Sequence, residues 1–397
     1  MPRKVPDDVI PPLYLTDDES LAIVDTADQI LRETIAAHEA FVATDGRTFP
    51  RAQWKHIRTK GSLQVFLSRS RFNVLPAKLR MTKRADKCNG AVSDSTSSTR
   101  SSSHRTSESG GGDGVPPKRM IFTMAGTLEG TLDDAAFGNI ADNEAVWKLR
   151  STYTKDYHHE YKILATLEAP TKADPFRFLG VKWSLKKLPA FMAFRDMVYL
   201  ESAGVIRDAQ GKITMGYNLM HSIELPGIPM LDQLKVYRLQ LSCCFLTKQC
   251  NDNTIEIYCR AFCFPTGTMF KRLGMVLYAE ALLAALNVTQ CAHMKKLMWL
   301  SHHRKQSHNG STESQDATHC HACLRSFKRL LPLAKSRATT CHCCRRVVCA
   351  RCCREQHVIV NLAEDNMVQA AVPYCLRCIA QAKTLSALDI AHATAPS

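Results

Sequence analysis

Ten of the 17 cysteines in this chain lie in one short basic segment. Eight of the ten form four Cys-x2-Cys pairs, separated by 17, four and 22 residues: Cys320 and Cys323, Cys341 and Cys344, Cys349 and Cys352, Cys375 and Cys378. Such a pair lets two thiolates reach one ion from a tight turn, and tetrahedral zinc takes four sulfur ligands. The spacing therefore predicts two Zn²⁺ ions. The alternative, a disulfide framework, is disfavoured in an intracellular chain.

The rest of the chain must supply the main hydrophobic core. Below about 70 to 80 residues a core is weak, so the Cys-rich segment is expected to fold around its metal. The length of 397 residues suggests two domains, and a hydrophobic content of 45% is enough for one of them to have a sizeable core.

The formal net charge of +15 favours anionic partners. Nucleic acid is an unlikely partner, because the basic residues are not interleaved with stacking aromatic residues.

No targeting or membrane-spanning segment is predicted. The first 14 residues contain four prolines and mixed charges, unlike a signal peptide. No apolar run approaches the 18 residues typical of a transmembrane helix. A cytoplasmic location is therefore expected, and the cysteines outside the paired segment are interpreted as small buried side chains.

The segment before the cysteines predicts an α+β fold. Thr16 and Glu19 have the spacing of a capping box and begin a helix of about 25 residues. Short strands are expected around Lys60-Gly61, and residues 85–118, rich in Ser and Gly, are predicted to form a disordered insertion. After a short helix at 132–140, alternating runs between 161 and 264 predict an antiparallel meander with one wet face.

A long apolar helix is predicted from about residue 270 to 300, since its hydrophobic residues recur at helical spacing. A curved antiparallel sheet closed by such a helix is a helix-grip arrangement, in which the helix covers a cavity. The predicted organisation is a tail at 1–16, the helix-grip domain at 17–301, a linker at 302–318, a zinc finger at 319–382 and a C-terminal tail at 383–397.

Residues 17–300 resemble the START-like lipid-transfer domains. The segments that carry this resemblance are Gly126–Asp134, Asp174–Trp183, Arg195–Glu201 and Cys291–Leu297. The resemblance implies a cavity for a hydrophobic ligand. Arg195, Glu201 and His221 lie in predicted strands and are the candidates for contacting a polar lipid head. No nucleophile with a matching base and no phosphate-binding glycine loop is found, so the chain is not expected to be an enzyme.

The Cys-rich segment resembles a FYVE-type zinc finger. Ala317–Cys323, Phe327 and Val347–Cys353 carry this resemblance. It implies a cross-brace in which Cys320, Cys323, Cys349 and Cys352 hold one Zn²⁺, and Cys341, Cys344, Cys375 and Cys378 hold the other. It also implies a peripheral location on endosomal membranes and phosphoinositide binding.

The residues that would bind the phosphoinositide headgroup are largely replaced. Arg337-Ala338-Thr339-Thr340 precedes the third cysteine, His342 replaces an arginine, and Pro373-Tyr374 precedes Cys375. Tight selectivity for phosphatidylinositol 3-phosphate is therefore not expected.

An apolar and basic loop is the alternative contact with acidic lipids. Its residues are Lys328, Arg329, Leu330, Leu331, Leu333, Lys335 and Arg337. The sequence thus favours a non-enzymatic, lipid-binding, membrane-associated adaptor. The alternative is a zinc-dependent protein-interaction module similar to RING or PHD fingers, with a protein partner and no membrane targeting.

Overall fold

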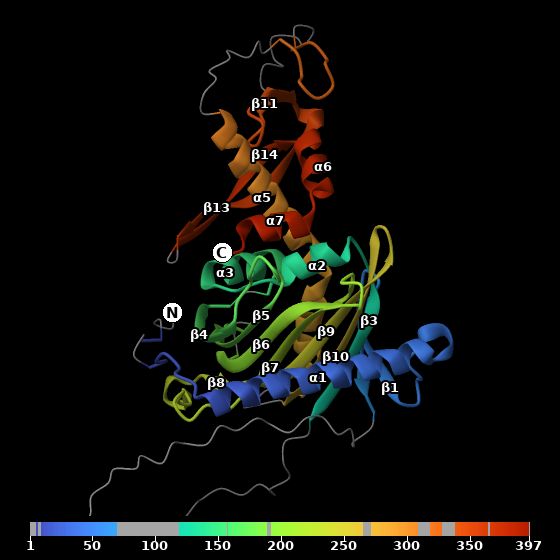
Figure 1. The fold of residues 1–397 in the computed structure, drawn as a ribbon, viewed down its shortest axis with the longest axis vertical. Helices are drawn as coiled ribbons and strands as arrows, with labels where there is room; N and C mark the ends of the chain where they lie inside the picture. The colour runs from blue at the N-terminus through green and yellow to red at the C-terminus, as the bar shows by residue number, and fades with distance from the viewer. Residues whose placement is uncertain are drawn as a thin grey trace, which may run out of the picture.

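The computed structural model describes residues 5–6, 9–69, 119–156, 158–188, 192–264, 271–308, 318–327, 338–363 and 366–396. Its largest element is a ten-stranded sheet with the order β1-β2-β3-β10-β9-β7-β6-β5-β4, in which the short β8 pairs with β6 (Figure 1). The strands are β1 (Trp54–Lys60), β2 (Leu63–Ser68), β3 (Met120–Glu129), β4 (Glu160–Glu168), β5 (Phe178–Lys186), β6 (Arg195–Arg207), β7 (Ile213–Ser222), β8 (Tyr237–Arg238), β9 (Gln240–Asn251) and β10 (Thr254–Phe264).

All the pairings in this sheet except that of β6 with β8 are antiparallel. The strands from β4 to β10 follow one another as the predicted meander, and β10 then pairs with β3, so that early and late strands share one sheet. The sheet with its C-terminal helix confirms the predicted α+β class.

The helices that pack on the sheet are α1 (Asp17–Ala43), α2 (Leu132–Asn139), α3 (Glu144–Thr154), α4 (Lys271–Leu282) and α5 (Val288–His308), with a 3₁₀ segment η3 (Leu283–Asn287) between the last two. The capping box that begins α1 is formed as predicted. The Glu19 amide donates to Thr16 Oγ1 at 3.2 Å, and the Thr16 amide donates to Glu19 Oε2 at 2.8 Å. Helix α3, capped by Asn143, was not predicted.

Both faces of the sheet are covered, so the prediction of one wet face is wrong. Helix α1 lies across β6, β7, β9 and β10 on the face that was expected to be wet (Figure 1). Ser242, one of the residues expected on the wet face together with Arg238 and Gln240, is buried. The polar residues on the strands form specific contacts with α1, for example Arg260 Nη1 to Glu33 Oε2 at 3.3 Å. The interface is nevertheless largely apolar, because Ile23, Ala27 and Ile30 of α1 share one buried cluster with Cys244 and Leu246 on the same face of β9. The polar residues at the start of β9 therefore did not indicate that the whole face is solvated.

The predicted helix at 270–300 consists of α4, η3 and α5, and α5 continues to His308 into the predicted linker. By length and composition the stretch Arg272–Lys305 could cross a membrane. In this structure, however, Cys291, Met294, Leu297 and Leu300 of that stretch are buried against other parts of the chain.

The Cys-rich segment and the residues that follow it form two small sheets and two helices beside α5, and α7 lies next to α2 (Figure 1). These elements are β11 (Ala338–Thr340), β12 (Val347–Cys349), β13 (Cys353–Ala363), β14 (Asn366–Cys375), α6 (Leu376–Thr384) and α7 (Ala387–Thr394). Helix α7 lies in the predicted C-terminal tail. It contacts α2 and α5, and its residues Ala387, Ile390 and Ala391 are buried. In the predicted N-terminal tail, Val5 and Ile10 are likewise part of the main core.

Candidate functional site

The eight paired cysteines gather into two groups of four. Cys320, Cys323, Cys349 and Cys352 form one group, and Cys341, Cys344, Cys375 and Cys378 form the other. Within each group the sulfur atoms all lie within 4.8 Å of one another. The alternate pairing of the four Cys-x2-Cys motifs is the arrangement that the cross-brace requires.

The sulfur geometry fits a tetrahedral metal ion. A Zn–S bond of about 2.3 Å with tetrahedral angles places two sulfurs about 3.8 Å apart. The Sγ atoms of Cys323 and Cys349 are 3.9 Å apart in the first group, and those of Cys344 and Cys375 are 3.9 Å apart in the second. Two metal ions can therefore be held by these eight residues.

Backbone amides support the sulfur atoms of both groups. The Cys349 amide donates to Cys320 Sγ at 3.3 Å, and the Cys375 amide donates to Cys341 Sγ at 3.2 Å. Such bonds orient metal ligands and stabilise their negative charge. Neither Cys343, which is buried, nor Cys353 belongs to a group of four. His319, His321 and His342, which are adjacent to these cysteines in the sequence, also lie outside both groups.

The Cys-rich part is fixed to α5 by a shared core. Leu297 and Leu300 of α5 belong to the same buried cluster as Tyr374 and the second group of cysteines. Within this contact, Ser301 Oγ lies 3.1 Å from the Tyr374 hydroxyl. Lys296 Nζ donates to Asp134 Oδ1 at 2.8 Å and to the carbonyl of Lys383 in α6 at 3.1 Å. One helix therefore joins the sheet domain and the metal-binding part.

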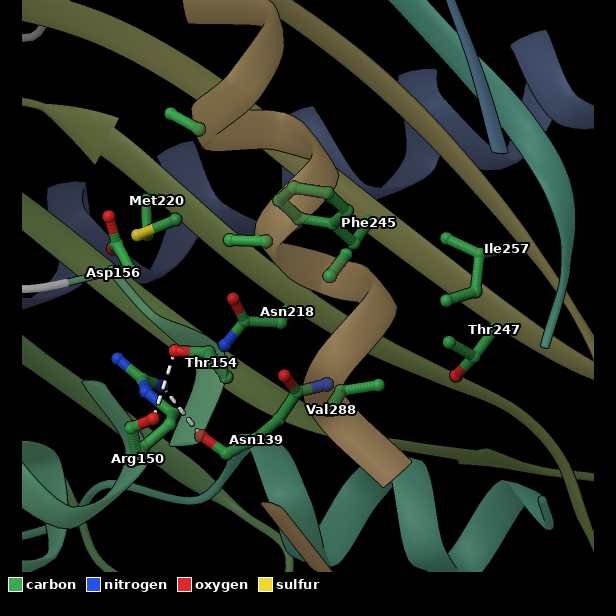
Figure 2. Close-up of a pocket in the computed structure, with 13 residues that line it drawn as sticks. Asn139, Arg150, Thr154, Asp156, Asn218, Met220, Phe245, Thr247, Ile257 and Val288 are labelled. Carbon is green, nitrogen blue, oxygen red and sulfur yellow. Dashed lines mark hydrogen bonds between the residues drawn. The ribbon is translucent and has the colours of Figure 1, made fainter. Parts of the chain in front are cut away.

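A second candidate site lies beneath α4, η3 and α5. It is a pocket of about 80 Å³ between these helices and the inner face of the sheet (Figure 2). Its apolar wall includes Met220, Phe245, Ile257 and Val288. Polar lining groups come from Asn139, Arg150, Thr154, Asp156, Asn218 and Thr247.

The polar end of this pocket is backed by a buried charge cluster. Arg150 Nη1 and Nη2 donate to the two carboxylate oxygens of Glu201 at 2.5 and 3.2 Å, and Lys182 Nζ donates to Glu201 Oε2 at 2.9 Å. Asn218 Nδ2 lies 3.3 Å from Glu201 Oε1. The Arg150 guanidinium also donates to the carbonyl of Asn139 at 2.6 Å (Figure 2). The charges are paired, as buried charges must be.

In this cluster the pKa of both Glu201 and Lys182 is lowered, which favours the charged form of the carboxyl but disfavours the charged form of the ammonium group. Burial raises the pKa of the Glu201 carboxyl, but the cations of Arg150 and Lys182 outweigh burial and lower this pKa to about 2. Burial is the largest influence on Lys182, and it lowers the pKa of the ammonium group to about 8 despite the attraction of Glu201. The ammonium group lies 4.8 Å from the ring centre of Trp147 and 4.4 Å from that of Phe178, within the distance of cation–π interactions.

The structure separates the three residues that the sequence suggested for the cavity. Glu201 does not line the pocket itself, but it is hydrogen-bonded to Arg150 and Asn218, which do. Arg195 lies at the start of β6, where its Nη1 donates to the carbonyls of Ala193 and Phe194 at 3.1 and 3.3 Å. Its guanidinium lies 5.1 Å from the ring centre of Tyr237, and it does not line the pocket.

His221 lines a different pocket, of about 200 Å³, with Arg119, Phe262 and Phe264. It is 2% exposed, and neither ring nitrogen has a partner in the part of the chain that is described. Burial, followed by the nearby charge of Arg119, lowers the pKa of His221 to about 4, so the ring is neutral at pH 7.

The loop predicted to contact acidic lipids lies outside the described residues, as does the Ser- and Gly-rich insertion at 85–118. The loop residues concerned are Lys328, Arg329, Leu330, Leu331, Leu333, Lys335 and Arg337.

Two residues of the charge cluster, Arg150 and Lys182, are not among the site residues predicted from the sequence. Lys182 carried a usable signal, because it is a lone cation within the apolar strand run Phe178-Leu179-Gly180-Val181-Lys182-Trp183, and a buried cation requires a partner. Arg150 gave no comparable signal, since it lies in the unpredicted helix α3 and becomes buried only when that helix packs.

Comparisons with known proteins found likenesses at the level of structure only. No family model matches this sequence, and no curated protein matches it. Among solved structures, the chain is similar to human STARD10, with a TM-score of 0.41 and 10% identity over 73% of this chain and 86% of that one. It is similar to human StAR-related lipid transfer protein 5, with a TM-score of 0.40 and 13% identity over 68% and 97%. A third similarity, to the human StarD13 lipid transfer and protein localization domain, has a TM-score of 0.36 and 12% identity over 70% and 98%.

Proposed function

We propose that this chain is a non-enzymatic lipid-binding protein that associates with membranes through its metal-binding part. The observation that carries the proposal is the pocket beneath α4, η3 and α5, which has an apolar wall and a polar end. A site with these two ends suits an amphiphile, whose chain contacts Met220, Phe245 and Ile257 and whose head meets Asn218 and Arg150.

The pocket must widen to admit a lipid, because about 80 Å³ is well below the 300–1,000 Å³ of ordinary ligand pockets. The helical segment that covers the pocket is interrupted between α4 and α5. Segment η3 is a 3₁₀ turn between two α-helices, and such a stretch often marks a hinge. Ala284 and Ala285 of η3 line the pocket directly. We expect α4 to swing outward about η3 when a ligand enters.

The two metal ions are proposed to be Zn²⁺, because sets of four thiolates with tetrahedral spacing favour zinc. Zinc in such a site stabilises the fold and leaves no open position for catalysis. The expected lipid contacts of the metal-binding part are acidic headgroups, in keeping with the positive charge of the chain.

Ligand binding is tested with fluorescent lipids. The intact zinc-loaded protein is mixed with vesicles that contain nitrobenzoxadiazole-labelled phosphatidylcholine, ceramide, sterol or fatty acid, and extraction is followed by loss of self-quenching. Ala285→Phe fills the pocket and should reduce extraction of the favoured probe at least tenfold. Val276→Phe, at a position on α4 that is 39% exposed, is the control and should extract normally. Equal extraction by both variants, or none by the wild type, would overturn the proposal.

Membrane association is tested separately by co-sedimentation with vesicles. We expect no preference for phosphatidylinositol 3-phosphate over its 4-phosphate isomer, because the residues expected to bind the 3-phosphate headgroup are replaced. A strong preference for the 3-phosphate would contradict this interpretation.

A further inference from the structure

A basic pocket lies where α5 meets the second group of cysteines. Its volume is about 310 Å³. Arg304 comes from α5, Arg346 follows the Cys341–Cys344 turn, and Arg377 and Gln381 belong to α6. The remaining lining residues are His321, Cys344, Cys375 and Cys378. No carboxylate is among the lining residues. Three parts of the chain therefore bring one arginine each to this pocket, and its only anionic groups are the metal-binding thiolates.

The three arginines are engaged to different extents. Arg304 Nη1 donates to Cys378 Sγ at 3.1 Å, and its Nη2 donates to Gln381 Oε1 at 2.6 Å. Arg346 Nη1 lies 3.0 and 2.9 Å from the two ring nitrogens of His321. Arg377 has no hydrogen-bond or ion-pair partner within the described residues. Arg346 and Arg377 are both exposed, so a ligand from solvent can reach them.

Neutralisation of the metal centre accounts for one of these cations. Four thiolates around a divalent ion leave a net negative charge, and Arg304 donates directly to one of the sulfurs. The side chains of Arg346 and Arg377 make no hydrogen bond to a sulfur atom within the described residues, and only the backbone of Arg346 bonds to the Cys344 thiol. The Arg377 guanidinium is available, and the Arg346 guanidinium uses only Nη1 in its contact with His321. The planar fork of a guanidinium matches the paired oxygens of a phosphate.

This pocket is separate from the residues that the FYVE resemblance would assign to the headgroup. Among those residues, the His342 amide donates to the carbonyl of Pro373 at 2.7 Å, and the His342 ring lies 5.5 Å from that of Tyr374. None of these three residues lines the basic pocket.

We propose that this pocket binds a phosphate monoester, with Arg346 and Arg377 contacting the phosphate oxygens. A monoester is favoured over a diester because it carries close to two negative charges at pH 7 and exposes three oxygens. The ligand is either the headgroup of a lipid or a soluble phosphate compound. This proposal does not depend on the pocket beneath α4.

The test compares a pocket variant with a charge-matched control in the full zinc-loaded chain. The pocket variant is Arg346→Gln/Arg377→Gln. The control is Arg325→Gln/Arg351→Gln, which removes the same charge from two exposed arginines that do not line the pocket. Zinc content is measured for each protein by elemental analysis, so that a loss of binding is not confused with a loss of metal.

Two ligand arms distinguish the source of the phosphate. Inorganic phosphate is titrated by calorimetry, with sodium chloride at equal ionic strength as the blank. Vesicles of phosphatidylcholine with phosphatidic acid, or with phosphatidylserine at equal charge, are used for co-sedimentation. We expect the pocket variant to bind phosphate or phosphatidic acid at least tenfold more weakly, while the control stays within twofold of the wild type.

The outcomes separate clearly. Binding of inorganic phosphate without retention on phosphatidic acid vesicles supports a soluble ligand. Retention on phosphatidic acid above phosphatidylserine, reversed by inorganic phosphate, supports a lipid headgroup. Equal losses in the pocket variant and the control would show diffuse electrostatic attraction and refute the site, as would a wild type that binds neither probe. Extraction of the fluorescent lipids is a separate readout, so its failure leaves this result standing.

Discussion

Replacing Glu201 with glutamine would leave the cations of Arg150 and Lys182 facing each other inside the protein. The side chain of Glu201 is 1% exposed and that of Lys182 is fully buried. Glutamine keeps the size of the residue, so the change removes the negative charge with little change in packing. We expect the free energy of unfolding to fall sharply.

The magnitude follows from the pKa of the carboxyl. Its pKa falls from 4.5 to about 2 in the folded protein. At about 1.4 kcal/mol for each unit of pKa, the charged form stabilises the fold by about 3 kcal/mol near pH 7. Breaking one side of a buried ion pair typically costs about 3–5 kcal/mol, which agrees. A loss of about 3–4 kcal/mol is therefore expected for Glu201→Gln.

Lys182→Met is the matched control. Burial lowers the pKa of Lys182, which means that its charge is unfavourable in the folded state. The variant keeps the two hydrogen bonds between Arg150 and Glu201 and removes that unfavourable charge. We expect it to cost less than half as much as Glu201→Gln. The double variant should recover at least about 1 kcal/mol relative to Glu201→Gln alone, because one cation is no longer unpaired.

Urea unfolding in zinc-containing buffer measures these differences, followed by the fluorescence of tryptophans such as Trp147, which is 1% exposed. The effect has a defined pH window. The folded-state pKa of Glu201 is depressed, so its contribution is present above pH 4.5 and is lost as the pH falls towards 2. The gap between wild type and Glu201→Gln should narrow in that window. If Lys182→Met costs as much as Glu201→Gln at pH 7, the account of the cluster is wrong.

Two other predictions concern the metal sites and the packing of α5. Elemental analysis should find two zinc ions per chain and about one in Cys341→Ser, since the second group would lose a ligand; one ion in the wild type would contradict the assignment. Gly138→Ala should cost about 1–3 kcal/mol in urea unfolding, because its Cβ would lie 2.2 Å from the Val288 carbonyl oxygen, whereas Gly227→Ala, with no atom within 4 Å, should be nearly neutral. Equal costs at the two glycines would show that the contact between α2 and α5 is not tight.

The metal ligands could be predicted from the sequence because their signal is local. Each Cys-x2-Cys turn is complete within four residues, and only the pairing of the turns depends on the fold. The resemblance supplied that pairing, and the two sulfur groups in the structure match it. The strands and α1 were also predictable, since alternation and capping are properties of short segments.

The charge cluster could not be predicted because it depends on register and on a helix. Glu201 lies opposite Gly180 in the pairing of β5 with β6, while Lys182 lies opposite Tyr199, so the two side chains meet diagonally. A shift of one residue would place them on opposite faces. The packing of α1 on β9 is a similar case, because the alternation at the start of β9 indicates which residues are polar but not which helix covers Cys244 and Leu246 further along the strand.

Helix α5 sets a fixed distance between the two proposed ligand sites. Val288 lines the pocket beneath α4, and Arg304 lines the basic pocket at the other end of the same helix. At about 1.5 Å per residue these positions are about 24 Å apart. Because the metal-binding part shares a core with α5, it cannot swing as it would on a flexible tether. A membrane lipid whose phosphate is bound at the basic pocket would therefore keep the pocket beneath α4 at a constant distance from the membrane surface.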